Sequence, residues 1–218
     1  MKLISLNLGL PRQIVWQGMD VTTSIYKGPV TGRIPLRTLN LDGDRQSDLS
    51  VHGGKDKAVY CYPVEHYSYW RLKLPNHSLD MGVFGENFTT EGLLEESVNI
   101  GDRFAIGSAE VVVTQPRMPC YKLGIRFQLN EMVKLFLDSR RSGFYVAVVR
   151  EGEVGAGDEI TKLGEASDSV SVSEIVRLYV AKTYNSDDVR LVRRAVAVEA
   201  LPESWKDYFR EKLGRLGS

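Results

Sequence analysis

The sequence predicts a mainly β protein with additional helices (α+β), in which a β-barrel of residues 1–165 precedes a small three-helix module of residues 170–218. Two observations support this prediction. Most of the first 165 residues form short apolar or alternating runs separated by turn residues, which favours a barrel or sandwich over a parallel sheet. The polar stretch "LGEASDSVSVSE" then indicates a linker, after which the pattern changes to short helices.

Strands are predicted wherever apolar residues alternate with polar ones or form a short run bounded by turn residues. In chain order these segments are 2–10, 32–44, 57–63, 97–116, 143–154 and 157–163. The fourth segment is long enough for two or three strands, and the last two segments are expected to form a strand pair. Two helices interrupt the strands, at 64–74 and 130–141, because apolar residues recur there at helical spacing.

The C-terminal module is predicted from helix-capping patterns. Ser171 and Glu174 match a capping box before the first helix, and Ser186 is expected to cap the second. The third helix is expected to start at Pro202 and to stop at Gly214. Each helix is too short to be stable alone in water, so we expect the three to bury one another. The module could dock an electron donor, form a homodimer contact or act as a lid that stabilises the barrel.

Composition narrows the classes of partner. Basic and acidic residues balance at 28 each, so we expect neither nucleic acid nor an anionic membrane as a partner. No apolar stretch approaches the roughly 18 residues needed to cross a bilayer, and the N-terminus lacks a signal-peptide pattern. The two cysteines form neither a disulfide framework nor a zinc pattern. These features predict a reduced, cytoplasmic protein.

The first candidate for chemistry is Cys120 in "TQPRMPCYKLG", which follows an apolar strand. Pro116 and Pro119 stiffen this loop, and the nearby cations Arg117 and Lys122 favour a thiolate. A thiolate acts as a nucleophile or as a soft metal ligand, whereas the alternative is a small buried residue. The other cysteine, Cys61, lies within a predicted strand and is expected to be structural.

Two polar loops are candidates for binding an anion. Adjacent glycines allow a backbone to approach a ligand closely, and Arg, His and Lys side chains suit phosphate. The first loop contributes Arg45, His52, Gly53, Gly54 and Lys55, and its alternative interpretation is a charged hairpin loop. The second loop, "GVFGENFTTEG", contains Asn87, or else forms only a tight turn. Cys120 with His52 is the one pair that could act as nucleophile and base.

Four motifs in order resemble the MOSC domain, which is found at the C-terminus of molybdenum cofactor sulfurases. They are "YKGPVTGRIP", "LDGDRQSDLSVHGGKDKAVYCYP", "GVFGENFTTEGL" and "VNIGDRFAIGSAEVVVTQPRMPCYKLG". Residues 170–218 are similar to the three-helix module of the YiiM-like branch of this family, so the resemblance covers nearly the whole chain.

The resemblance implies a barrel that binds the molybdenum cofactor (Mo–molybdopterin), with Cys120 as the protein ligand of molybdenum. It places Lys27, Arg45, His52, Gly53, Gly54 and Lys55 near the pterin and its phosphate. Asn87 and Arg117 would line the same pocket, and His52 could instead donate a proton to a leaving hydroxyl group. The sequence departs from many relatives at Gly28, where we expect a small hydroxyl residue.

The implied activity is the reduction of N-hydroxylated compounds, such as 6-N-hydroxylaminopurine, to amines. The chain contains no flavin, haem or iron–sulfur motif, so an external flavoprotein is expected to supply the electrons. Cys120 and His52 are then the candidate catalytic residues. A different hypothesis is a carrier that passes the cofactor, or sulfur held on Cys120, to another enzyme. A third is a protein that binds some other anion and no metal.

Overall fold

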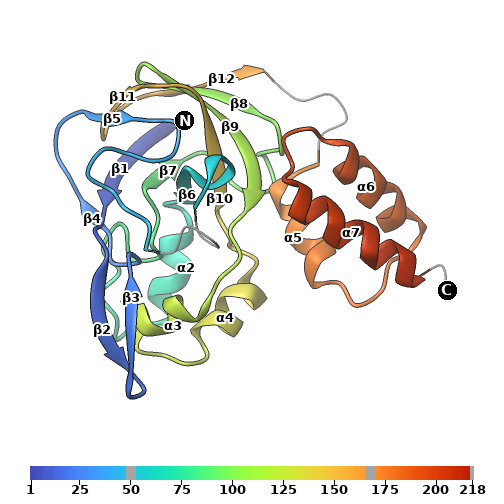
Figure 1. Cartoon of the computed structure of the whole chain (residues 1–218), viewed down its shortest axis with the longest axis horizontal. Coiled ribbons are helices and arrows are strands. Elements are labelled where there is room, and N and C mark those ends of the chain that lie inside the picture. Colours follow the sequence, from blue (N-terminus) through green and yellow to red (C-terminus); the bar gives the residue numbers. More distant parts are fainter. Residues whose placement is uncertain (48–52, 165–169, 217–218) are drawn as a thin grey trace.

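The computed structural model describes residues 1–47, 53–164 and 170–216. It confirms the predicted class, because a large curled sheet is followed by a separate group of C-terminal helices (Figure 1). The main sheet has the order β12-β8-β9-β10-β6-β7-β1-β4. Its strands are β1 (Lys2–Leu8), β4 (Gly28–Pro29), β6 (Val59–Pro63), β7 (Phe88–Glu91), β8 (Arg103–Ile106), β9 (Ala109–Pro116), β10 (Phe144–Arg150) and β12 (Ile160–Gly164).

The main sheet curls back on itself. Neighbouring strands are antiparallel except β6 and β7, which run parallel. The start of β1 bonds to the segment that leads into β12: the Leu3 amide donates to the Asp158 carbonyl at 2.9 Å, and the Ile160 amide donates to the Met1 carbonyl at 2.9 Å. These bonds join the two sides of the sheet and give it the barrel-like form that the strand pattern predicts.

Two small strand pairs flank the main sheet: β5 (Ile34–Leu36) pairs with β11 (Gly152–Val154), and β2 (Arg12–Trp16) pairs with β3 (Met19–Thr23). The hairpin of β2 and β3 was not predicted. The prediction that 143–154 and 157–163 pair with each other is wrong, because β10 lies between β9 and β6, whereas β12 pairs with β8. Long-range pairing decides these partners, and the local pattern does not encode it.

Helices cover one end of the sheet. The predicted helices are present as α2 (His66–Lys73) and α4 (Met132–Ser139). Two further elements were missed, the 3₁₀ turn η1 (Lys55–Lys57) and the helix α3 (Tyr121–Phe127). Aromatic side chains of α2, α4 and β6 form a second core beside the sheet, in which the rings of Trp70 and Phe136 stack with centroids 5.8 Å apart.

The C-terminal module consists of α5 (Val172–Val180), α6 (Ser186–Ala197) and α7 (Glu203–Leu216). The capping box of Ser171 and Glu174 is confirmed. The predicted cap at Ser186 is wrong by one residue, because Asn185 is extended and its side chain accepts from the Asp188 amide. The third helix follows Pro202 as predicted but continues past Gly214 to Leu216. A glycine inside a helix costs only about 1 kcal/mol, which does not suffice to end it here.

The module shares its core with the sheet. Ile175, Val192 and Phe209 belong to the same hydrophobic cluster as Val111 and Val113 of β9. The Trp205 indole also donates to the Gln115 side-chain oxygen at 2.8 Å. The predicted boundary between 165 and 170 falls mainly outside the described residues and stays a prediction. Within the described residues, no helix combines the length and apolar character that crossing a membrane requires.

The shared core predicts that sheet and module unfold together. Phe209 is fully buried, so Phe209→Ala should lower the free energy of unfolding by about 3–5 kcal/mol through lost contacts and a cavity. Leu72→Ala is the control, because Leu72 is 84% exposed and should change stability by less than about 0.5 kcal/mol. Urea denaturation followed by tryptophan fluorescence and circular dichroism should give one coincident transition. Two separate transitions, with only one shifted by Phe209→Ala, would contradict a shared core.

Candidate functional site

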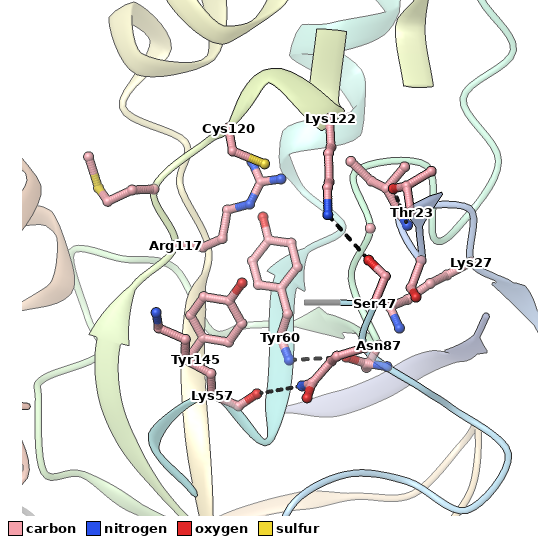
Figure 2. A pocket seen from close by; sticks show the side chains of 15 residues that line it. Thr23, Lys27, Ser47, Lys57, Tyr60, Asn87, Arg117, Cys120, Lys122 and Tyr145 are labelled. Carbon is pink, nitrogen blue, oxygen red and sulfur yellow. Dashed lines mark hydrogen bonds between the residues drawn. The ribbon is translucent and has the colours of Figure 1, made fainter. Parts of the chain in front are cut away.

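Cys120 lies where the sheet gives way to helices. Strand β9 ends at Pro116, residues 117–119 cross the end of the sheet, and Cys120 is the N-cap of α3 with an extended backbone. Proline has no amide to extend the β ladder, which explains why the strand stops there. The Cys120 side chain is half-buried and faces a pocket (Figure 2). Cys61 is only 2% exposed within β6, as its predicted structural role requires.

The pocket beside Cys120 has a cavity volume of about 90 Å³. Its walls come from the β3 end, the loop before residue 48, β6, β10 and the start of α3 (Figure 2). The described lining residues are Thr23, Ser24, Ile25, Lys27, Gln46, Ser47, Lys57, Tyr60, Gly85, Asn87, Arg117, Met118, Cys120, Lys122 and Tyr145. Segments far apart in the sequence therefore converge on one thiol.

The pocket wall is cationic. Lys27, Lys57, Arg117 and Lys122 line it, and none of the described lining residues carries a carboxylate. Burial lowers the pKa of Lys27, although the adjacent Asp44 acts in the opposite direction. Burial also lowers the pKa of Lys57. Positive side chains that are partly removed from water favour an anionic ligand, because such a ligand replaces the lost hydration.

Arg117 gives the clearest sign that a ligand belongs in the pocket. Its side chain is 5% exposed, and its Nη1 has no hydrogen-bond partner in the described part of the chain. The guanidinium lies 5.3 Å from the Tyr60 ring centroid and 5.0 Å from that of Phe136, so aromatic faces stabilise its charge. A buried donor without an acceptor is costly, and an electron-rich ligand would remove that cost. The residues present thus fit an anionic cofactor.

Lys27 is held in place by a buried network. Its Nζ lies 2.5 Å from Asp44 Oδ1, and Asn87 Nδ2 donates to Asp44 Oδ2 at 3.0 Å. The Gly9 amide also donates to Asp44, at 2.8 Å. Asn87 Oδ1 accepts from the Tyr60 amide at 3.3 Å, so the Asn87 side chain is bonded on both sides. Asn87 therefore shapes the wall and orients Asp44, and one of the four cations is already neutralised.

Two tyrosines form the floor of the pocket. Tyr60 of β6 and Tyr145 of β10 are register partners, and their ring centroids lie 5.4 Å apart. Burial raises the pKa of each phenol, while Arg117 acts in the opposite direction, so both hydroxyl groups remain protonated near neutral pH. A protonated phenol can donate one hydrogen bond, and that of Tyr60 goes to the Ser142 carbonyl oxygen at 2.8 Å.

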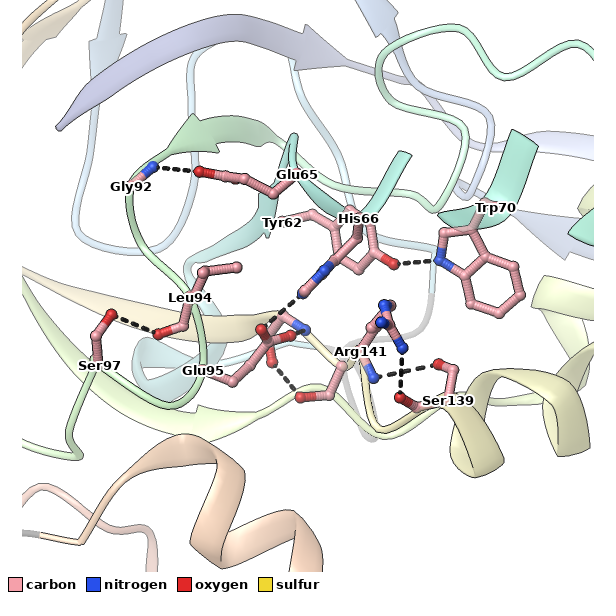
Figure 3. A network of polar contacts seen from close by, with 12 residues as sticks. Tyr62, Glu65, His66, Trp70, Gly92, Leu94, Glu95, Ser97, Ser139 and Arg141 are labelled. Carbon is pink, nitrogen blue, oxygen red and sulfur yellow. Dashed lines mark hydrogen bonds and ion pairs between the residues drawn. The ribbon is translucent and has the colours of Figure 1, made fainter. Parts of the chain in front are cut away.

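A second buried network reaches the turn that leads into β10 (Figure 3). His66 Nε2 lies 2.7 Å from Glu95 Oε2, and the Gly143 amide donates to Glu95 Oε1 at 2.7 Å. Gly143 has φ +61°, and an added Cβ would lie 2.4 Å from the Cys61 carbonyl oxygen. The Gly143 carbonyl in turn accepts from the Arg117 amide at 3.3 Å. Glu95 thus fixes the turn at Gly143, and the carbonyl of Gly143 holds the Arg117 amide.

The structure brings together four of the residues that the sequence analysis placed in the site, namely Lys27, Asn87, Arg117 and Cys120. Arg45, Gly53, Gly54 and Lys55 are described but are not among the residues that line this pocket. Arg45 is exposed, and Lys55 lines a separate groove beside the α6–α7 connection. His52 lies outside the described residues, so its proposed role stays a prediction.

Several lining residues were not singled out as ligand contacts. Lys57 and Tyr145 come from strands and turns whose register the sequence does not reveal. Tyr60 was not among the predicted site residues either. Lys122 was noted only as a neighbour of Cys120. In the described residues no three His, Cys, Asp or Glu side chains converge to hold a metal. A metal that brings its own cofactor ligands would need only Cys120 from the chain.

Comparisons with known families agree with this geometry. The family described as "MOSC domain" matches residues 48–161, and the family described as "YiiM-like, 3-alpha helix domain" matches residues 170–215. The crystal structure of YiiM from Geobacillus stearothermophilus superposes with a TM-score of 0.80 and 30% identity, covering 97% of this chain and 98% of that one.

Three relatives extend the comparison. Protein YflK of Bacillus subtilis (strain 168) is 40% identical over 98% of this chain and 95% of its own length. Protein YiiM of Escherichia coli (strain K12) is 35% identical over 84% of this chain and 81% of its own length. A protein named "Reductase" from Gibberella moniliformis is 32% identical over 76% of this chain, which spans 30% of that longer protein.

The different surroundings of the two cysteines predict different reactivity. Burial raises the pKa of the Cys61 thiol, whereas Cys120 faces the pocket. In cofactor-free native protein, Ellman's reagent should therefore modify one thiol per chain rapidly, and two after denaturation. Cys120→Ala should abolish the rapid phase. Rapid modification of Cys61 in native Cys120→Ala protein would contradict the assignment.

The Glu95 network predicts a specific stability loss. Glu95→Ala leaves His66 and the Gly143 amide without their buried partner and should cost about 3–5 kcal/mol in the free energy of unfolding. Glu95→Gln should cost less, because the amide oxygen still accepts from Gly143. Glu96→Ala is the neighbouring control, since Glu96 is exposed. Equal stability of all three variants in denaturant titrations would show that the network contributes nothing.

Proposed function

The chain belongs to the family of MOSC-domain proteins that carry a YiiM-like three-helix domain, and we propose that it is a molybdenum-cofactor-dependent reductase. Its substrates are N-hydroxylated compounds, such as 6-N-hydroxylaminopurine, which it converts to amines. An external flavoprotein supplies the electrons. MOSC is a family of molybdenum-cofactor-binding domains, and one relative is named a reductase, which supports reductive chemistry at such a cofactor.

The observation that carries this proposal is the setting of Cys120. A half-buried thiol in a rigid turn faces a pocket that is lined by four cations and, among its described residues, by no carboxylate. Cys120 would be the protein ligand of the metal, because a thiolate is a suitably soft ligand. Lys57, Arg117 and Lys122 would neutralise the anionic cofactor, and the orphaned Arg117 Nη1 would gain an acceptor.

The bound cofactor would supply two-electron chemistry at the metal, and the chain would bind and orient the reactants. The pocket walls keep bulk water from Cys120 on the side of β6 and β10. The half-buried Tyr145 ring offers an apolar, π-rich surface of the kind on which a planar purine can stack. Asp44, which Asn87 holds in place, fixes Lys27, so this ion pair presents a preorganised edge of the pocket rather than a mobile one.

Metal content is the direct test. Protein made in a host that synthesises the cofactor should contain close to one molybdenum atom per chain by mass spectrometry. Cys120→Ala should lose it, whereas Cys61→Ala, a change inside β6, should keep it. Cys120→Ser should also lose reduction of 6-N-hydroxylaminopurine by at least about 100-fold. A Cys120→Ser variant that keeps full activity would refute the proposal.

A carrier gives a different result in the same experiment. The intact protein would hold the cofactor or sulfur through Cys120 but would not reduce N-hydroxylated compounds with any reduced flavoprotein. Delivery of its cargo to a cofactor-free acceptor enzyme would then depend on Cys120. Absence of both metal and molybdopterin from all samples would favour a pocket for some other anion.

A further inference from the structure

Tyr60 and Tyr145 stand side by side in the pocket, yet their hydroxyl groups have different partners (Figure 2). The Tyr60 hydroxyl donates to the Ser142 carbonyl oxygen at 2.8 Å. Its only proton is therefore already used within the protein. The Tyr60 side chain is also 3% exposed, so its hydroxyl serves the wall of the pocket more than its contents.

Unlike the Tyr60 hydroxyl, the Tyr145 hydroxyl donates no hydrogen bond to another described residue. The Arg117 guanidinium opposes the rise of the Tyr145 pKa that burial causes, and no acceptor for the proton of this hydroxyl is found in residues 1–47, 53–164 or 170–216. The side chain is half-buried and lines the pocket, so this proton is available to a ligand. A guanidinium has no acceptor, so the neighbouring Arg117 cannot take up the Tyr145 proton.

Arg117 provides a second unused donor on the same wall. Its Nη1 has no acceptor within the described residues although the side chain is 5% exposed. One neutral and one charged donor thus lie together on the pocket side of β10 and β9, close to Cys120. An oxygen atom with two lone pairs can accept from both, and the charged donor gives the stronger bond.

We propose that Tyr145 is a catalytic residue that, with Arg117 Nη1, donates hydrogen bonds to the oxygen of the substrate's N–O bond. This inference rests on the proposed reductase function. The overall reaction is R–NHOH + 2 e⁻ + 2 H⁺ → R–NH₂ + H₂O. The N–O bond breaks, the reduced flavoprotein supplies both electrons, and solvent supplies both protons. Negative charge develops on the departing oxygen, so donors aimed at it stabilise the transition state more than the bound substrate.

The same donor pair explains how an N-hydroxylated compound would be distinguished from the corresponding amine. The amine lacks the oxygen, so its binding would leave the Tyr145 hydroxyl and Arg117 Nη1 without acceptors. A site built to hydrogen-bond a substrate oxygen rejects an analogue that lacks it, because buried donors then remain unpaired. The product amine would therefore leave more readily than the substrate.

The test compares Tyr145→Phe with Tyr60→Phe in the cofactor-loaded protein. Without electron donor there is no turnover, so calorimetry can give the affinities for 6-N-hydroxylaminopurine and adenine. Wild type should prefer the N-hydroxylated base. Tyr145→Phe should reduce the ratio of the two affinities by about 3- to 10-fold, the loss expected for one hydrogen bond. Tyr60→Phe should retain this ratio and instead lower thermal stability, since its hydroxyl bonds only to the protein.

Turnover and metal content complete the test. Tyr145→Phe should lower kcat by at least about 10-fold with molybdenum content equal to wild type. The inference is overturned if Tyr145→Phe keeps the wild-type affinity ratio, if both variants lose it equally, or if Tyr145→Phe loses the metal, which would assign Tyr145 to the cofactor. A wild-type protein that loads the cofactor yet neither reduces nor distinguishes the two bases would refute the proposed function, and this inference with it.

Discussion

The position of β10 between β6 and β9 is the constraint on which the site depends. It places Tyr145 opposite Tyr60 on one side and opposite Gln115 on the other. A shift of one residue would turn Tyr145 away from the pocket, because side chains alternate between the faces of a strand. The register begins at Gly143, whose positive φ and close approach to the Cys61 carbonyl leave no room for a side chain. The Glu95 carboxylate then holds the Gly143 amide and completes the constraint.

The strand order and register bring four cationic side chains into one pocket with the Cys120 thiol. Four cations in one pocket repel each other and lose hydration, and the buried Asp44 carboxylate, 2.5 Å from Lys27, offsets part of this cost. Aromatic faces offset part of the cost for Arg117. An anion that binds in the pocket offsets more of it, so a ligand selective for the folded pocket also stabilises the fold. The repulsion between the cations lowers the stability of the ligand-free fold, and the same repulsion favours the binding of an anion.

The sequence revealed the parts of this arrangement that are local. Cys120 stands out because prolines and cations flank it, and the capping box at Ser171 is a short-range pattern. Helix α3 was missed because Pro119 and Gly124 suggest a loop, although burial of Leu123 and Phe127 overrides that propensity. Tyr145 could not be recognised as a pocket residue, since its place comes from pairing with strands about 30 and 85 positions away. His66 and Glu95, likewise, share no sequence pattern.

Two of the hydrogen bonds that join the C-terminal module to the rest of the chain involve residues linked to the pocket wall. Trp205 of α7 donates to Gln115, which is the β9 partner of Tyr145. The Ser173 amide of α5 donates to the carbonyl of Glu95, whose side chain holds Gly143. The first contact reaches Tyr145 through Gln115, and the second reaches Gly143, two residues before Tyr145, through Glu95. The module therefore supports the wall that carries Tyr145 and Arg117, which explains why helices too short to fold alone are packed against this end of the sheet.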